Sequence, residues 1–169
     1  MSVRPATTRD AATISRIQER GWQAAYRHVF PVEELDRGGF VEPARWRDRL
    51  RHPPKGWVTL VAEHGHDVVG FAALGPSRDL PELGELYAIY VDPDQWSGGA
   101  GRALMGAAER ELGARYGEAT LWVLEDNARA RRFYELAGWS PDGARKTHER
   151  WGVAPPELRY RKRLNSSRS

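Results

Sequence analysis

Apolar positions along the first third of the chain follow helical spacing. Between Ile14 and Ala25 they recur three to four residues apart, which predicts a helix that Thr8 caps at its start. Pro43 suits the first turn of a second, basic helix over Ala44–Arg51, because proline is well tolerated at a helix N-terminus. The chain therefore opens with helical material and carries most of its strands further on.

Strand-like runs, rich in β-branched and aromatic residues, alternate with helices in the rest of the chain. Two of these runs flank a short loop around Gly65, which predicts a β-hairpin. Amphipathic helices are expected over Arg102–Tyr116 and over Asn127–Ala137, the second closed by Gly138. This order favours a mixed α/β sheet, antiparallel at first and with a parallel crossover near the end. The predicted strands are Ser2–Pro5, Trp57–Glu63, Val68–Leu74, Glu85–Val91, Ala119–Val123, Ala144–Arg150 and Leu158–Leu164.

Length and composition fit one globular domain. The chain has 169 residues, close to the typical domain size of about 150 residues. The absence of cysteine excludes a disulfide framework, a cysteine nucleophile and thiolate metal sites. No secretory signal is visible, and the longest apolar run, Val68–Leu74, is far shorter than the about 20 residues of a membrane span. We therefore expect a soluble, cytoplasmic protein that does not enter a membrane.

Charge constrains the ligands only to a small degree. Lys and Arg number 26 against 23 Asp and Glu, a formal net charge of +3, which permits an anionic ligand without requiring one. His64 and His66 lie in the predicted hairpin loop without further ligands nearby in sequence, so they indicate a turn, and no metal is expected.

A glycine-rich loop follows the strand that ends at Val91 and leads into a predicted helix. Backbone amides of such a loop, together with the positive end of the helix dipole, can cradle a pyrophosphate. The loop does not match the dinucleotide-binding motif G-x-G-x-x-G, because Leu104 occupies the position of the third glycine. It does not match the P-loop motif G-x-x-x-x-G-K-[ST] either, because Ala107 and Ala108 follow Gly106. On the loop alone, an ordinary glycine-rich turn is an equally good interpretation.

At this loop the chain resembles the GNAT superfamily, the GCN5-related N-acetyltransferases, whose pyrophosphate loop has the pattern [QR]-x-x-G-x-[GA]. One register starts at Gln95 and matches every letter, whereas the other places Trp96 at the Gln or Arg position with Gly99 and Gly101 as the glycines. The second register is preferred because Arg102 and the residues after it resemble the start of the family's helix, and it makes Trp96 a departure from the pattern.

The segment from Asn127 to Trp139 resembles the family's second cofactor motif, N-x-x-A-x-x-[FL]-Y-x-x-x-G-[FW], at every lettered position. The resemblance implies a single-domain GNAT fold over residues 1–164, with a mixed, mostly antiparallel sheet of six to seven strands and about four helices. Residues 165–169 are expected to form a disordered tail.

The resemblance also implies an enzyme that moves an acetyl group from acetyl-CoA to a primary amine of a small molecule, a peptide N-terminus or a lysine. Tyr134 matches the family's general acid, which protonates the leaving thiolate. Glu85 has the placement of the base in one branch of the family, and a water molecule is the alternative. Because the chain has no cysteine, direct attack within a ternary complex is favoured over a thioester relay.

Coenzyme A contacts are implied for backbone amides where the Glu85–Val91 strand splays, for the glycine loop and for the second motif. Asn127 would also cap its own helix, and one arginine of that helix would meet the 3′-phosphate. The implied cofactor-binding residues are Ile89, Tyr90, Val91, Trp96, Ser97, Gly98, Gly99, Ala100, Gly101, Arg102, Asn127, Ala130, Arg131 and Phe133.

Trp22, Tyr26 and Phe30 recur every four residues on the first helix, which is typical of core packing. In the family the same helix forms a wall of the acceptor site, so these residues, with Tyr87, are candidate substrate contacts.

A non-catalytic protein that senses acyl-CoA or binds nucleic acid is the competing hypothesis. The basic run Arg159–Arg163 motivates nucleic-acid binding, but it alternates as a strand does and lacks an aromatic platform. The expected partner is an amine acceptor, and the expected state is a monomer or homodimer.

Overall fold

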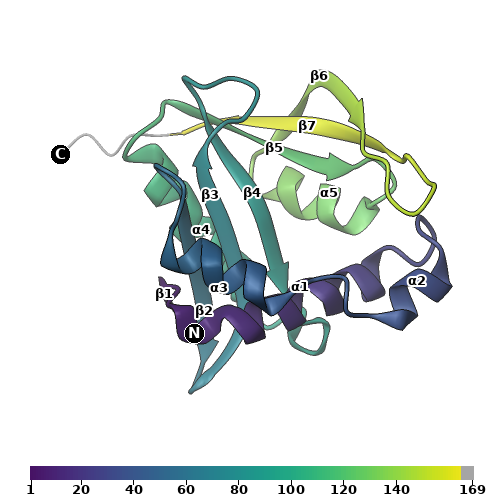
Figure 1. Ribbon diagram of the computed structural model, residues 1–169. Helices are drawn as coiled ribbons and strands as arrows, with labels where there is room; N and C mark the ends of the chain where they lie inside the picture. The colour runs from purple at the N-terminus through teal and green to yellow at the C-terminus, as the bar shows by residue number, and fades with distance from the viewer. Residues whose placement is uncertain (165–169) are drawn as a thin grey trace.

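The computed structural model describes residues 1–164, which form one seven-stranded sheet with helices on both faces (Figure 1). The strands are β1 Ser2–Pro5, β2 Val58–His64, β3 Asp67–Pro76, β4 Gly84–Val91, β5 Glu118–Leu124, β6 Ser140–Thr147 and β7 Pro156–Arg163. The α-helices are α1 Ala11–Ala25, α2 Val32–Arg37, α3 Pro43–Arg51, α4 Ala100–Gly113 and α5 Ala128–Leu136.

The sheet has the strand order β1-β2-β3-β4-β5-β7-β6, and only β4 and β5 run parallel. Their pairing covers just two residue pairs, Gly84 with Ala119 and Glu85 with Thr120. Beyond Glu85 the two strands diverge, while β4 continues to pair with β3 as far as Val91. The sheet is therefore split from this point toward the C-terminal ends of β4 and β5.

Each face of the sheet buries its own apolar cluster. On one face, Ile14 and Ile17 of α1 and Trp46 of α3 pack against Phe71 of β3. On the other face, α4 and α5 cover a larger cluster that includes Leu104. Figure 1 shows α1 and α3 in front of the sheet and α4 behind it. Because α4 packs on β3, β4 and β5, it bridges the split between β4 and β5.

The predicted α/β class and mixed, mostly antiparallel sheet are confirmed, with differences at element ends. Within the described part of the chain there are five α-helices where about four were expected, because α2 has only six residues and no periodicity to reveal it. β6 begins at Ser140, four residues before its predicted start, because this edge strand is exposed along nearly its whole length and lacks an apolar pattern. The predicted disordered tail lies outside the described residues.

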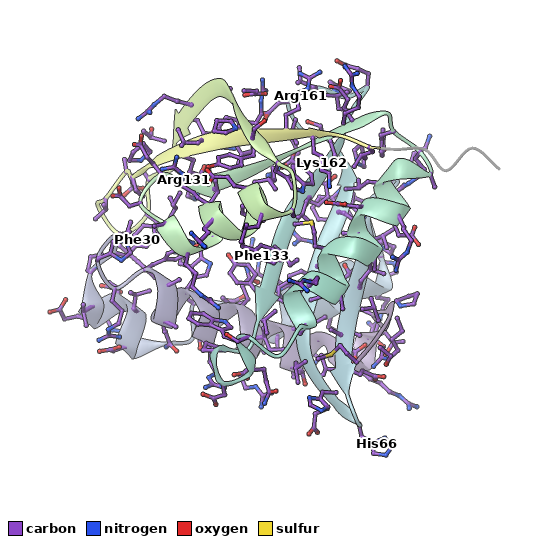
Figure 2. The ribbon with its side chains drawn as sticks, turned by 180° about the vertical axis from the view of Figure 1, so that it is seen from behind. Phe30, His66, Arg131, Phe133, Arg161 and Lys162 are labelled. Carbon is purple, nitrogen blue, oxygen red and sulfur yellow. The ribbon has the colours of Figure 1, made fainter. Side chains whose placement is uncertain are left out.

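Between residues 1 and 164 no helix is long and apolar enough to cross a membrane. The same range holds no group of three or more His, Asp and Glu side chains placed to share a metal ion. His66 lies at the tip of the β2–β3 hairpin (Figure 2).

We predict that Gly70→Ala destabilises the fold, because β3 approaches β4 and α4 closely at Gly70. A Cβ there would lie 2.9 Å from the carbonyl oxygen of Tyr90 and 3.0 Å from Leu104 Cδ1. Overpacking of this kind costs about 1–3 kcal/mol of the free energy of unfolding, measurable by urea denaturation. The control is Gly117→Ala, which meets nothing within 4 Å and should change stability by less than about 0.5 kcal/mol. Equal stability of the two variants would contradict the close packing.

Candidate active site

A cavity of about 1410 Å³ opens where β4 and β5 diverge. Its walls come from α1, β4, the loop before α4, the first turn of α4, the end of β5 and α5. All but three of the predicted site residues contribute to these walls. Those that do are Trp22, Tyr26, Phe30, Tyr87, Ile89, Tyr90, Val91, Trp96, Ser97, Gly99, Ala100, Gly101, Arg102, Asn127, Ala130, Phe133 and Tyr134.

The first turn of α4 presents unpaired backbone amides to this cavity. The first bond within the helix runs from Ala103 N–H to the Gly99 carbonyl at 3.0 Å. The amides of residues 100–102 therefore have no partner inside the helix. Gly99 precedes the helix with a left-handed backbone at φ 92°, a conformation that glycine adopts without strain. Amides and helix dipole together suit a phosphate or pyrophosphate.

The geometry favours the second register of the loop motif. Trp96, Gly99 and Gly101 all line the cavity, as that register requires. Gly98, a glycine of the first register, lies outside the cavity wall and donates its amide to the Gln95 carbonyl at 3.2 Å.

Trp96 fixes the loop to the strand that precedes it. Its indole N–H donates to the carbonyl of Val91 at 2.9 Å. The guanidinium carbon of Arg129 lies 3.5 Å from the centre of the ring, a close cation–π contact. On the other side of the loop, Arg20 of α1 donates to both carboxylate oxygens of Asp92 at 2.7–2.8 Å. Trp96, which replaces the Gln or Arg of the family's loop pattern, thus has a structural role, since it joins the loop to β4 and to α5.

The split also turns backbone amides of β4 toward the cavity. Asp92 N–H donates to the Val69 carbonyl of β3 at 2.8 Å. Because alternate amides of a strand point to opposite edges, those of Ile89 and Val91 point away from β3, into the gap left by β5. Donors at this place can stabilise negative charge on a carbonyl oxygen.

Three phenols gather in the cavity beside these amides. Tyr90 accepts a hydrogen bond from the indole N–H of Trp22 at 2.9 Å. Burial raises the pKa of Tyr134 well above its ordinary value near 10, and the nearby Tyr90 adds to the rise. Burial raises the pKa of Tyr26 in the same way, with Tyr90 and Tyr134 contributing. All three hydroxyls therefore keep their protons at neutral pH and can act as donors.

Glu85 lies outside the cavity, in contrast to its predicted role as a base. Its side chain is fully buried, and one oxygen accepts the backbone amide of Arg78 at 3.0 Å. The other oxygen pairs with the Arg78 guanidinium at 2.5 Å. The carboxylate is thus committed to tying the 76–84 connection to the start of β4.

Arg131 is the third predicted site residue that lies off the cavity wall. Its Nε donates to the hydroxyl of Tyr160 at 2.9 Å, and its Nη1 donates to the carbonyl of Glu125 at 3.1 Å. Figure 2 shows Arg131 on α5, close to β7. These bonds give Arg131 a structural role between α5 and the sheet, and they leave Arg129 as the arginine of α5 that lines the cavity.

Sequence reasoning did not single out Glu157, a carboxylate on the cavity wall. It pairs with Leu124 across β5 and β7, at the end of β5 nearest the split. Burial raises the pKa of Tyr90, and the charge of Glu157 contributes to that rise, so the two side chains are electrostatic neighbours. Lys146 Nζ lies 4.0 Å from Glu157. Only the register of β7, which no local signal fixes, places Glu157 here.

The basic strand β7, which motivated the nucleic-acid hypothesis, has its cations paired. Arg161 and Lys162 project from β7 (Figure 2), and each meets a carboxylate on its own face of the sheet. The pairs on this strand are Arg159 with Asp142, Arg161 with Glu118, and Lys162 with Glu109. Little charge is left free for phosphates, which counts against that hypothesis.

Comparison with known proteins agrees with this geometry. The model of the acetyltransferase (GNAT) family matches residues 17–139, which is most of the chain. The chain belongs to the GNAT family. The predicted resemblance is therefore confirmed, and the family supports acetyltransferase activity and coenzyme A binding.

Individual relatives support the same assignment. This GNAT chain is 34% identical over 131 residues to the uncharacterized N-acetyltransferase YuaI of Bacillus subtilis, covering 75% of this chain and 73% of YuaI. It is 41% identical over 106 residues to a mycothiol acetyltransferase of Kocuria rhizophila, covering 59% of this chain but only 32% of that protein. The PaiA N-acetyltransferase of Thermoplasma acidophilum, solved with coenzyme A, shares the fold with a TM-score of 0.76 at 17% identity, covering 96% and 98% of the two chains.

We predict that Trp96→Phe weakens coenzyme A binding about 2–10-fold, because the hydrogen bond that holds the loop to Val91 is lost while the ring beside Arg129 is kept. A neutral hydrogen bond contributes about 0.5–1.5 kcal/mol, which sets this range. Isothermal titration with coenzyme A measures it. Trp57→Phe is the control, since Trp57 stacks on Tyr87 and lies on neither the loop nor the cavity wall. Unchanged affinity of Trp96→Phe would show that the loop needs no anchor.

Proposed function

We propose that this GNAT protein transfers the acetyl group of acetyl-CoA to a primary amine by direct attack within a ternary complex. The observation that carries the proposal is the arrangement of the cavity. Amides of α4 suited to a pyrophosphate lie at one part of it, and amides of β4 beside a buried tyrosine lie at the split. When bound, acetyl-CoA supplies a thioester whose carbonyl carbon bonds to the amine nitrogen as the carbon–sulfur bond breaks.

The amides of Ile89 and Val91 would hold the carbonyl oxygen of the thioester. They are fixed by the pairing of β4 with β3, so they need no rearrangement when negative charge develops on that oxygen. Such preorganised donors contribute about 3–4 kcal/mol each to transition-state stabilisation in well-studied cases.

Tyr134 would give its proton to the leaving sulfur. Tyr134 lines the cavity and its hydroxyl is held by no hydrogen bond among residues 1–164, so the proton is free for transfer. Burial raises the pKa of Tyr134, which by itself makes it a weaker acid. The same dry surroundings raise the pKa of a thiol, because burial penalises every anion. Burial therefore raises the pKa of the phenol and the pKa of the thiol together, and the proton transfer between them stays feasible.

Glu157, rather than Glu85, would accept the proton of the incoming amine, directly or through water. An alkyl amine has a pKa near 10.4 and is charged at neutral pH, so a base must act before attack. Glu157 lines the cavity and is an electrostatic neighbour of Tyr90, while Glu85 is buried against Arg78 and lies off the cavity wall. A carboxylate at Glu157 also attracts the ammonium form of the acceptor.

We predict that Tyr134→Phe lowers kcat on the order of 100-fold, the lower end of the range for lost general-acid catalysis, and leaves coenzyme A affinity nearly unchanged. The raised pKa keeps the wild-type phenol protonated, so Tyr134 should cause no loss of rate as pH rises to 10. Steady-state kinetics against pH and isothermal titration measure both effects. An unchanged kcat would assign Tyr134 to packing alone.

We predict that Glu157→Gln changes the pH profile of the reaction and that Glu85→Gln does not. Without its base the first variant depends on amine that has lost its proton in solution, so the loss in kcat/KM should be greatest near pH 6 and shrink toward pH 10. The second variant should keep the wild-type profile but lose about 1–3 kcal/mol of stability, because Arg78 loses its charged partner. Kinetics from pH 6 to 10 and urea denaturation measure these effects. A profile shift in Glu85→Gln alone would return the role to Glu85, and no shift in either would leave it to water.

A further inference from the structure

Arg150 lies in a cage of aromatic rings at the acceptor end of the cavity. Its guanidinium carbon is 4.6 Å from the centre of the Trp151 ring, 5.2 Å from Trp22 and 5.5 Å from Phe40. Contacts at these distances hold a guanidinium by cation–π attraction. The rings attract the guanidinium group but carry no net charge, so its positive charge is not neutralised.

The chain adopts a strained turn to form this cage. Arg150 and Val153 exchange two backbone hydrogen bonds of 2.8 and 3.0 Å. The two residues between them, Trp151 and Gly152, have φ of 54° and 78°, which is the left-handed pair of a tight hairpin turn. Glycine adopts this conformation freely, but a tryptophan there is strained by about 1–3 kcal/mol. Backbone strain of this kind is typical of sites where the position of a side chain matters for function.

The guanidinium of Arg150 has no acidic partner within residues 1–164. Its Nε is buried and makes no hydrogen bond to any described residue. A buried, unpaired charged donor is costly, so its presence indicates a ligand or water that satisfies it. Arg150 borders two cavities at once, the large one already described and a second of about 220 Å³.

The second cavity is lined by two further arginines of α3, Arg45 and Arg49. Neither has a carboxylate within 4.0 Å in the described part of the chain, and Glu42, the acidic residue on the wall, forms no ion pair there. Burial lowers the pKa of Arg49, and the like charges of Arg45 and Arg78 lower it further. Three guanidinium groups thus border a small space whose wall holds a single carboxylate, that of Glu42.

Trp22 borders both this positive cavity and the cavity that holds the proposed site of transfer. The indole N–H of Trp22 donates to Tyr90 in the large cavity, and its ring faces Arg150. Trp22 and Arg150 are shared by the walls of both cavities. An extended ligand can therefore reach from Tyr90 and Glu157 past Trp22 to Arg150.

We propose that the acceptor carries a carboxylate that binds to Arg150, Arg45 and Arg49 while its amine lies at Tyr90 and Glu157. The acceptor is then an amino acid or short peptide whose amine and carboxylate are separated by at least the width of an indole ring. This inference rests on the proposed acetyl transfer, because it names the acceptor of that reaction. Opposite charges at the two ends of the site also fix the orientation of such a zwitterion.

The test compares ω-amino acids, from 4-aminobutanoate to 6-aminohexanoate, and dipeptides such as glycylglycine with the amide of each. For the best acceptor, we expect the KM of the free acid to be at least tenfold lower than the KM of its amide. Arg150→Gln should remove that preference by raising the KM of the acid at least tenfold while leaving the amide unchanged, and Arg49→Gln should act in the same direction. Arg47→Gln, on an exposed part of α3 away from both cavities, is the matched control.

Isothermal titration separates the possible failures. Protein that does not bind coenzyme A would contradict the proposed function itself. Protein that binds coenzyme A, but whose coenzyme A complex binds acid and amide equally, would overturn the carboxylate site alone. Binding of the acid that survives both Arg150→Gln and Arg49→Gln, with melting temperatures confirming that the variants are folded, would overturn it as well.

Discussion

The early divergence of β4 and β5 is the constraint on which the rest of the molecule depends. Two residue pairs hold the parallel strands together, and after Glu85 the amides along the free edge of β4 have no strand beside them. Unpaired backbone donors inside a fold are costly unless water or a ligand satisfies them. Here the core on each face of the sheet sustains the opening. The fold thus maintains a gap whose donors are ready for an incoming carbonyl group.

A small number of polar contacts then fixes what surrounds the gap. Arg20 ties the loop before α4 to α1 through Asp92, and Trp96 ties the same loop to the end of β4. Glu85 and Arg78 hold the other end of β4 in place. These contacts lie beside the cavity, and they position the amides of α4 and β4 relative to one another. The carboxylate of Glu85 therefore matters to the site through geometry, even though it lies outside the cavity.

Most residues that the sequence singled out for the site line the cavity, whereas their chemical roles stay predictions. The Asn127–Trp139 motif indicates where Tyr134 lies, on the cavity wall, because its spacing lies within one helix, where the rise and turn per residue are fixed. The position of Glu85 off the cavity wall could not be foreseen, because its partner Arg78 comes from a connection with no regular pattern. Arg131 and Arg129 lie on opposite flanks of the same helix, and only the packing of α5 on β7 decides which one faces the cavity. Glu157 depends on strand register, which no local signal determines.

The family match covers only part of the site. Residues 17–139 match the family, and they include the α4 amides, the β4 edge and Tyr134. Arg150 and Glu157 lie after this segment, as does the strained turn at Trp151. The matched segment therefore contains the part of the cavity that suits coenzyme A, together with Trp22, Arg45 and Arg49 of the proposed acceptor site. Family membership does not by itself identify the acceptor, and its recognition would depend on the charges of the proposed acceptor site: the carboxylate of Glu157 at one end and three arginine side chains at the other. A zwitterionic acceptor would bring an opposite charge to each of these ends.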